Sequence, residues 1–451
     1  MVVKKTGWVV ALSVVVSLAA TGCGSDKKPE ASSSSVPKQE PTAAATSAAT
    51  PETKKEPVTL KFMQYTASGS QEQTLAEMVK AFETANPDVK VKVDIVDYNN
   101  YYTKLNTQLA SGDAPDVFEV GYENFVSYAA KNTLKDLTPI IAKDTTFKPE
   151  IYKGLAYDSF KYQNKQYGVV ESFSDVVLFY NKDLFDKKQV EYPKADWTWK
   201  QELEAAEKLT DAKSGVWGTY SPIQFYEFYK TIAQNGGGIW SADGKPTVNS
   251  KENIEALNWM LDKAKKYKVS PALNDDTFNQ PDADLNAFKA GKIAMLRGGI
   301  WNFGRFADAP FKWDIALEPG NTKKAHHFFA DGLVVSDKTK NAEAAWKFIK
   351  FMSSDPAVVS KRIEKGWSVP AVSDEKVMDA YFKQTPPQSK KVVLDALNSL
   401  VLTPVGPIPD KWNDLTKAIG DELDKAKLKS DYTAEKALNE AQAKVEKLVA
   451  K

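Results

Sequence analysis

The chain has 451 residues, of which 42% are hydrophobic and 11% aromatic, enough to form a sizeable buried core. Its 60 lysine and arginine residues and 59 aspartate and glutamate residues give a formal net charge of +1. This balance argues against a nucleic-acid-binding protein, which normally carries a surplus of basic residues.

The first residues have the pattern of a secretory signal peptide. Lys4 and Lys5 precede an apolar run over 9–20, and small residues follow it. The run is shorter than the roughly 20 apolar residues of a membrane-spanning helix. Cys23, the only cysteine, comes directly after, and this arrangement resembles the lipobox of bacterial lipoproteins. The resemblance implies that residues 1–22 are a lipoprotein signal peptide and that Cys23 is acylated, with palmitate among its acyl chains. The alternative is ordinary secretion.

The next segment has the composition of a tether. Residues 24–57 contain no aromatic residue and almost nothing that could form a core. Such a segment cannot bury enough apolar surface to offset the entropy of ordering, and we expect it to be disordered. A flexible chain of about 34 residues has a root-mean-square reach on the order of 30–35 Å. We therefore expect 23–57 to hold a globular body away from a membrane.

From Val58 onward the composition becomes globular, and strand patterns alternate with helix patterns. Apolar patterns predict strands at 58–63, 89–95 and 116–120. The spacing of apolar residues between them predicts helices at 75–82 and 101–110. Repeated strand–helix units of this length indicate a parallel sheet covered by helices. Ligands of open α/β sheets bind beyond the carboxyl ends of the strands, and we expect a site there.

The remainder of the chain adds further strands and a stretch rich in aromatic residues. Strands are expected at 166–170, 176–180 and 333–336, and the region from Lys411 to Lys451 is expected to be helical. Most aromatic residues between 197 and 301 are expected to be core residues. Because roughly 390 residues exceed a single hydrophobic core, two domains are expected.

Four segments in order resemble one protein family. They are Ala114 to Phe118, Val177 to Phe185, Phe288 to Trp301, and Asp331 to Ile349. Over nearly all of residues 58 to 430 the chain resembles the extracellular solute-binding proteins of ABC importers, in the maltose-binding-protein-like carbohydrate branch.

The resemblance implies a two-lobed periplasmic-binding-protein-like α/β fold, in which each lobe is a sheet flanked by helices. Hinge segments are expected near 176–180, 328–331 and 366–370, and the lobes would close over a ligand between them. The implied division of the chain is an N-lobe at 58–176 and 331–366, and a C-lobe at 177–330 and 367–451.

A sugar ring has an apolar face and a belt of hydroxyls, so its site needs flat aromatic surfaces and a few polar partners. Tyr122, Glu123 and Asn124 follow the third strand, where the family places sugar contacts. Glu171 and Asp175 precede the hinge strand, in another contact region. Trp301 aligns with a tryptophan that stacks on a sugar ring in the family. Further candidates are aromatic or polar residues of the same regions: Tyr65, Gln71, Trp217, Trp240, Arg297, Trp367 and Trp412.

The sequence shows no sign of a catalytic motif or of a metal site. No G-x-S-x-G, P-loop or H-E-x-x-H motif is present. His326 and His327 are adjacent, and on a strand they would point to opposite faces, which suits a shared metal poorly. Asp282 begins a segment like a calcium loop, but Ala287 and Ile293 stand where the EF-hand needs Gly and Glu. We therefore expect neither a metal nor a cofactor.

The sequence therefore predicts a non-catalytic, monomeric receptor, lipid-anchored on the outer face of the bacterial cytoplasmic membrane. It would capture a sugar, an oligosaccharide by preference, and deliver it to permease subunits that rely on a separate ATPase. One alternative is a receptor for a cationic ligand such as a polyamine, which Arg297 near the pocket would disfavour. A less favoured alternative is a surface glycoside hydrolase, with Glu171 and Asp175 as its acidic pair.

Overall fold

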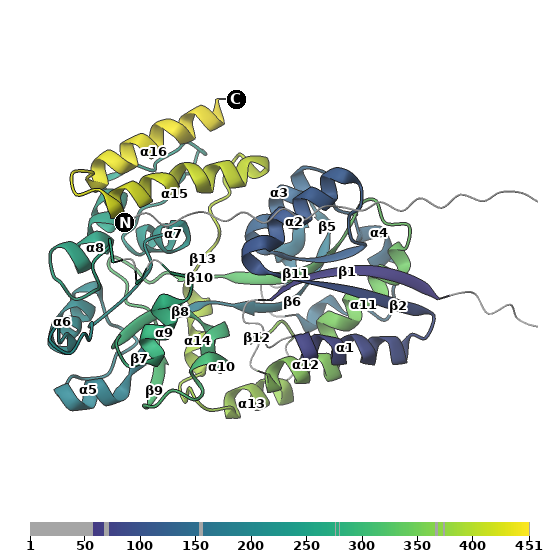
Figure 1. Ribbon diagram of the computed structural model, residues 1–451. Coiled ribbons are helices and arrows are strands. Elements are labelled where there is room, and N and C mark those ends of the chain that lie inside the picture. The colour runs from purple at the N-terminus through teal and green to yellow at the C-terminus, as the bar shows by residue number, and fades with distance from the viewer. Residues whose placement is uncertain are drawn as a thin grey trace, which may run out of the picture. The chain divides into compact units, whose positions relative to one another are not determined.

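The computed structural model describes residues 57–66, 72–152, 157–275, 277–278, 280–365, 369–372 and 375–450 (Figure 1). The signal peptide, Cys23 and the tether up to residue 56 lie outside the described residues, as do Gln71 and Trp367. All described residues belong to one structural unit, which spans 55–451.

A six-stranded sheet organises the first lobe, which we call the N-lobe. Its strand order is β12-β6-β11-β3-β1-β2. The strands are β1 (Val58–Thr66), β2 (Val89–Asp97), β3 (Val117–Gly121), β6 (Gly168–Ser174), β11 (Phe329–Val335) and β12 (Val369–Pro370). β1 pairs in parallel with β2 and β3, whereas β11 is antiparallel to β3 and to β6. The expected parallel sheet therefore holds for β1 to β3, and later segments of the chain add antiparallel strands to it.

Helices with an apolar face pack on this sheet. Along α1, the residues Leu75, Met78 and Phe82 recur at helical spacing and are buried. The ring of Phe82 packs edge-on against Phe348 at 5.0 Å between centroids. The helices of the N-lobe are α1 (Glu72–Ala85), α2 (Tyr98–Ser111), α3 (Tyr122–Ala130), α4 (Thr138–Ile141), α11 (Ala342–Ser354), α12 (Pro356–Glu364) and α13 (Glu375–Lys383). Short elements between them are η1 (Pro149–Ile151), η2 (Asp158–Phe160), β4 (Lys161–Tyr162) and β5 (Lys165–Gln166).

A three-stranded antiparallel sheet, in the order β8-β7-β9, organises the second lobe, the C-lobe. Its strands are β7 (Val176–Asn181), β8 (Met295–Gly299) and β9 (Trp313–Ala316). Its helices are α5 (Lys182–Lys188), α6 (Trp199–Leu209), α7 (Phe225–Gln234), α8 (Lys251–Lys265), α9 (Ala283–Lys289), α10 (Phe303–Phe306), α14 (Lys391–Ala396), α15 (Trp412–Leu428) and α16 (Ala434–Val449). Short elements are η3 (Ile300–Asn302), β10 (His326–His327), η4 (Leu397–Ser399), β13 (Leu400–Val401) and η5 (Pro409–Lys411).

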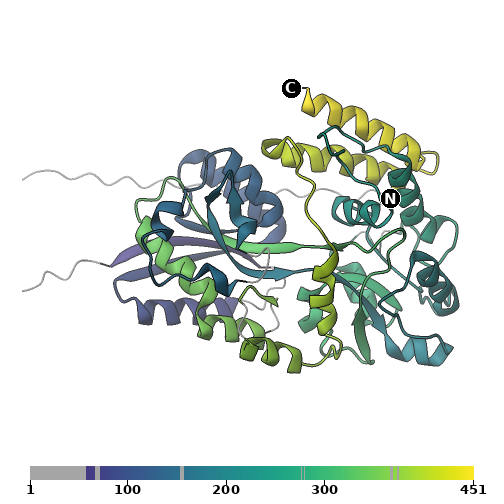
Figure 2. The same cartoon turned by 180° about the vertical axis from the view of Figure 1, so that it is seen from behind.

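The last two helices form a second core in the C-lobe. α15 and α16 lie side by side in both views (Figures 1 and 2). Leu415, Ile419 and Leu423 of α15 and Leu438 and Val445 of α16 are all buried there. Among the described residues, none of the helices has both the length and the apolar character needed to span a bilayer.

Three segments join the lobes. Asp175 alone connects β6 to β7, and Phe328 alone connects β10 to β11. Asp175 directly precedes the segment 176–180, and Phe328 begins the segment 328–331, the two segments near which hinges are expected. The third crossing lies between Gln384, which donates to the Ile363 carbonyl in the N-lobe at 2.6 Å, and Ser389, which donates to Asp314 of β9 in the C-lobe at 2.8 Å.

The predicted third hinge at 366–370 and the boundary between 366 and 367 therefore differ from the structure. β12 pairs with β6, and Val372 forms a bridge with Tyr152, so the chain is still part of the N-lobe there. α13 then packs on α12 before the chain crosses. A two-residue strand such as Val369–Pro370 is too short to give a periodic pattern, which is why its pairing could not be predicted from the sequence.

Candidate functional site

The carboxyl ends of β1 and β3 carry polar and aromatic residues of the N-lobe. Glu123 lies in the first turn of α3, directly after β3, and its side chain is only 6% exposed. Its carboxylate lies over Gly121, where a Cβ would be 2.4 Å from Oε1, so a residue with a side chain would displace it. Asn124 donates to Glu123 Oε1 at 3.3 Å. Burial raises the pKa of Glu123 to about 7, and the charge of Asp331 adds to this effect.

Tyrosines from β1 and α2 pack beside this carboxyl group. Tyr65 donates a hydrogen bond to Asp331 Oδ1, and its ring lies edge-on to Tyr98 and Tyr101, at 5.1 and 5.0 Å between centroids. Tyr102 accepts a hydrogen bond from the Gly121 backbone at 3.1 Å. The tyrosines of β1 and α2 therefore lie at the same sheet edge as Glu123.

A group of buried carboxyls lies deeper in the N-lobe. Glu171 forms an ion pair with Arg362, whose Nη1 also donates to the Met352 carbonyl at 2.7 Å. Burial raises the pKa of Asp331 to about 6, although the hydrogen bond from Tyr65 lowers it. Burial and the neighbouring Glu171 raise the pKa of Glu119 well above its usual range. The carboxylate of Glu171, a predicted sugar contact, is thus paired with Arg362 in this structure.

A second set of aromatic rings comes from α7, β10 and η3 of the C-lobe and from Phe329 at the start of β11 in the N-lobe sheet. Phe329 stacks on His327 at 5.0 Å and lies 6.1 Å from Tyr226 and 5.9 Å from Trp301. His327 in turn lies edge-on to Tyr229 at 5.3 Å. Trp301 is half-buried. Its ring lies directly over Gly299, where a Cβ would be 2.1 Å away.

The two sets of rings meet at the junction of the lobes. Tyr122 lies 6.0 Å from Phe328, the residue of the second crossing. Besides burial, the charge of Glu123 raises the pKa of Tyr226, on α7 of the C-lobe, and α3 packs against η5 of the C-lobe. We call this group the ring cluster: Tyr65, Tyr98, Tyr122, Tyr226, Tyr229, Trp301, His327 and Phe329. Flat rings around a buried carboxyl suit a ligand with apolar faces and hydroxyl edges.

Several predicted contacts lie elsewhere. Trp412 is 1% exposed and packs edge-on to Phe225 at 5.5 Å in the C-lobe core, apart from the ring cluster. Trp240 donates to the Pro404 carbonyl at 2.8 Å, and its ring lies against Gly406. Trp217 is half-buried and bridges Ile293 through its backbone, on the part of the C-lobe sheet outside the ring cluster. Sequence similarity locates the turn or helix that carries such a residue, but packing decides which way its side chain points.

Arg297, another predicted contact, is enclosed among glutamates. It is buried, its two terminal nitrogens donate to the two carboxylate oxygens of Glu202 at 2.8 and 2.6 Å, and its Nε lies 3.2 Å from Glu318. Lys230 and Lys263 complete a buried network with Glu227, and its three glutamates balance its three cations. The guanidinium is thus neutralised and is not presented to a ligand. Arg305, the other arginine near Trp301, pairs with Asp282 at 2.7 Å.

Asp175 occupies the first crossing and is fully buried, so the structure does not present it to a ligand either. Among the described residues, neither of its carboxyl oxygens has a hydrogen-bond partner. Burial, assisted by the charge of Glu318, raises the pKa of Asp175 well above its usual range. Its backbone carbonyl accepts from Ile300 N at 3.1 Å, which ties the crossing to η3.

Sequence reasoning missed the contributions of Tyr98, Tyr226, Tyr229, His327 and Phe329. One signal was available, because Tyr98, Tyr101 and Tyr102 follow directly on the second strand, whose carboxyl end lies at the predicted site edge. The sequence of α7 gave no comparable signal of a binding site, because aromatic residues in a helix usually belong to the core. Within the described residues, no group of three or more His, Cys, Asp or Glu residues is placed to hold a metal ion.

The chain is similar to one protein family and to several known proteins. The sequence model of one family, described as bacterial extracellular solute-binding protein, matches residues 67–359. The arabinooligosaccharide-binding protein of Bacillus subtilis is 27% identical over 317 residues, which are 68% of this chain and 71% of the relative. The diacetylchitobiose binding protein DasA of Streptomyces coelicolor is 28% identical over 296 residues, which are 62% of this chain and 66% of the relative.

Among solved structures, the ABC substrate-binding protein Lmo0181 from Listeria monocytogenes, in complex with cycloalternan, is similar throughout the globular part. It is 46% identical, with a TM-score of 0.82, and the match covers 88% of this chain and 100% of that protein.

Proposed function

This chain belongs to the family of bacterial extracellular solute-binding proteins, and on that premise we propose that it binds an oligosaccharide at the ring cluster. We further propose that it is not an enzyme and that it delivers the ligand to the permease of an ABC importer, which is powered by a separate ATPase subunit. The relatives named above are described as binders of oligosaccharides, which supports this ligand class.

One observation carries the proposal. Trp301 and Tyr226 both lie against Phe329, Tyr65 packs on Tyr98 and Tyr101 in the N-lobe, and the charge of the buried Glu123 acts on Tyr226. Aromatic faces bind the apolar faces of sugar rings, and a carboxyl or phenol hydroxyl can exchange hydrogen bonds with sugar hydroxyls. A ligand held between the two sets would favour closure of the lobes around the three crossings.

We propose a neutral oligosaccharide. Arg297, which could have paired with an acidic sugar, is already neutralised by glutamates. The 46% identity to a protein in complex with cycloalternan makes cycloalternan the first ligand to test.

Isothermal titration with cycloalternan, maltotriose, an arabinooligosaccharide and spermidine tests the proposal directly. We expect one of the oligosaccharides to bind with one-to-one stoichiometry and to remain chemically intact. A ligand at 100 times its dissociation constant should also stabilise the protein by about 2.7 kcal/mol. The charge of Arg297 is neutralised, so Arg297 does not argue against a cationic ligand. The spermidine titration tests whether the protein binds one. Binding of spermidine without any sugar, or hydrolysis of the bound sugar, would contradict the proposal.

The location follows from the N-terminal pattern. We propose that lipid on Cys23 anchors a monomer on the outer face of the cytoplasmic membrane, with residues 23–57 as the tether. The lone cysteine directly after the apolar run supports this proposal.

A further inference from the structure

A cavity lies beside the third crossing, and no residue of the ring cluster lines it. Its volume is about 310 Å³. Its walls come from both lobes, since Ile300 and Phe303 belong to η3 and α10, whereas Tyr381 and Gln384 follow α12 on the N-lobe side. Lys390, just past the crossing, completes the wall.

Lys390 is the unusual feature of this cavity. It is 3% exposed, and its Nζ donates to the Tyr381 carbonyl and to Gln384 Oε1, both at 3.3 Å. Its ammonium also lies over the rings of Tyr381 and Phe303, at 4.9 and 5.8 Å from their centroids. Within the described part of the chain, no carboxylate comes within 4.0 Å of it. Burial lowers the pKa of Lys390 to about 8, as expected for a cation that lacks a counter-ion.

A second polar group at the cavity is also unpaired. Tyr381 is 2% exposed, and its hydroxyl has no hydrogen-bond partner among the described residues. Burial, and after it the charge of Asp175, raises the pKa of Tyr381, and its hydroxyl remains available to donate to a ligand. At the rim, Glu364 and Lys365 neutralise each other at 3.3 Å, which leaves the charge of Lys390 uncompensated.

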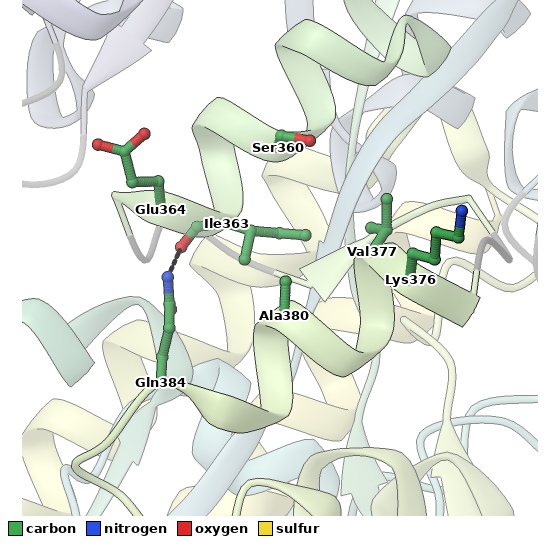
Figure 3. A pocket seen from close by; sticks show the side chains of 7 residues that line it. All are labelled: Ser360, Ile363, Glu364, Lys376, Val377, Ala380 and Gln384. Atoms are coloured by element: carbon green, nitrogen blue, oxygen red, sulfur yellow. Dashed lines mark hydrogen bonds between the residues drawn. The ribbon is translucent and has the colours of Figure 1, made fainter.

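The geometry around Lys390 is held in place by Gln384. Figure 3 shows the neighbouring cavity between α12 and α13, about 330 Å³ in volume, which shares Gln384 and Glu364 with the first. The dashed line there is the hydrogen bond from Gln384 to the Ile363 carbonyl. Because its amide nitrogen is fixed in this way, the side-chain oxygen of Gln384 stays directed at Lys390.

We propose that the cavity beside the third crossing binds a small organic carboxylate. Its carboxylate would accept hydrogen bonds from the Lys390 ammonium and the Tyr381 hydroxyl, and its apolar body would lie against Phe303 and Ile300. The charge-assisted hydrogen bond supplies the missing counter-ion, and the ring and aliphatic walls account for selection of an organic acid over an inorganic anion.

Occupancy of this cavity is coupled to ligand binding at the ring cluster. Ile300, in the cavity wall, and Trp301, in the ring cluster, are consecutive residues of η3. The walls also belong to both lobes, so the carboxylate binds with different affinity in different lobe arrangements. By linkage, each ligand then changes the affinity for the other by the same factor. The coupling rests on the proposed function, whereas the carboxylate site does not.

Calorimetric titration with benzoate, and with benzyl alcohol as its uncharged analogue, tests the carboxylate site without any sugar. We expect benzoate to bind, benzyl alcohol to bind much more weakly, and K390M to weaken benzoate binding by at least about tenfold. The matched control is K391M, which removes the neighbouring exposed lysine and should bind benzoate normally. Absence of benzoate binding by the full chain, or equal binding by K390M, would overturn the proposal.

A second variant separates loss of the carboxylate site from misfolding of K390M. Ala307 lines the cavity and is exposed, so A307F fills the cavity and leaves Lys390 in place. It should also abolish benzoate binding, and normal binding by A307F would place benzoate elsewhere and overturn the proposal.

For the coupling arm, the dissociation constant of the sugar is measured with and without saturating benzoate. A change in the dissociation constant of the sugar, matched by the same factor for benzoate, confirms the coupling. An unchanged dissociation constant of the sugar refutes the coupling but not the carboxylate site. If no sugar binds but benzoate does, the proposed function fails and the site remains.

Discussion

At the scale of single residues, the candidate site depends on which side chains remain accessible after packing. Trp301 is half-buried, and its ring lies in the space that Gly299 leaves by lacking a side chain. Trp412, a residue of the same type and equally a candidate, is enclosed by the C-lobe core. Residue type alone therefore does not separate a stacking residue from a core residue.

The first prediction concerns Trp301. W301A should weaken oligosaccharide binding by about 1.5–4 kcal/mol, the range for truncation of an aromatic residue that carries binding energy. Titration calorimetry measures the affinity, and W217A is the control, because Trp217 is also half-buried but lies outside the ring cluster. A large fall in melting temperature of W301A with near-normal affinity would show that Trp301 is a core residue instead.

The second prediction concerns the buried carboxyl of Glu123. Its pKa is raised from 4.5 to about 7, so the folded protein keeps a proton that the unfolded chain releases. The stability contributed by this proton is present below the unfolded pKa and is lost as the pH rises through the folded value.

Wild-type protein should therefore lose stability relative to E123Q between about pH 5 and pH 8, because glutamine does not titrate. Melting temperatures of both proteins across this interval provide the measurement. A constant difference between the two proteins would show that Glu123 is already ionised at the acidic end.

At the scale of elements, the buried ion network links α6, α7, α8 and β8 through Glu202, Glu227, Lys263 and Arg297. Such a network gains little over apolar packing as a whole, but loss of one member leaves an uncompensated buried charge. Its role is thus to hold the C-lobe helices against the sheet, behind the turn that carries Trp301.

The third prediction follows from this network. R297M should destabilise the protein by about 3–5 kcal/mol, because Glu202 loses both of its hydrogen bonds from the guanidinium. The affinity of the protein that remains folded should change little. Chemical denaturation and calorimetry separate the two effects, and R305M, which removes an exposed ion pair, should stay within about 0.5 kcal/mol of wild type. Selective loss of affinity in R297M at unchanged stability would restore Arg297 as a ligand contact.

At the scale of the whole molecule, three crossings join two lobes that carry complementary halves of the ring cluster. Two crossings consist of single residues between strands, Asp175 and Phe328. Small changes of backbone angle at such links suffice to rotate one lobe against the other.

The fourth prediction is that saturating oligosaccharide contracts the molecule. The radius of gyration from small-angle scattering should fall, because closure brings the two sets of rings together around the ligand. W301A at the same sugar concentration is the control and should remain expanded. An identical scattering profile of the wild type with and without bound sugar would argue against hinge closure.

The fifth prediction concerns the anchor. C23S should move the protein from the membrane to the soluble fraction or the medium, because no acyl chain can be attached, while its affinity for sugar stays unchanged. Fractionation after a salt wash, followed by immunoblotting, measures this. Retention of C23S in the washed membranes would exclude the lipid on Cys23 as the anchor.

The order of the elements, the two-lobed α/β fold and the family could be predicted from the sequence, and the structure and comparisons confirmed them. This succeeded because periodic apolar patterns are local, so β1, α1, β2, α2 and β3 each appear in consecutive residues. The position of Tyr122 and Glu123 at the sheet edge followed from the same local reasoning, since a parallel strand ends directly before them.

Tertiary structure alone decided which candidates face a ligand. Arg297 and Glu202 are 95 residues apart in the chain, so no local pattern could reveal that the arginine is neutralised. The rings of α7 join those of β1 and α2 only because the three crossings bring the lobes together. Burial, pairing of charges and side-chain direction depend on contacts between distant segments, whereas helix and strand formation depend on neighbours within a few residues.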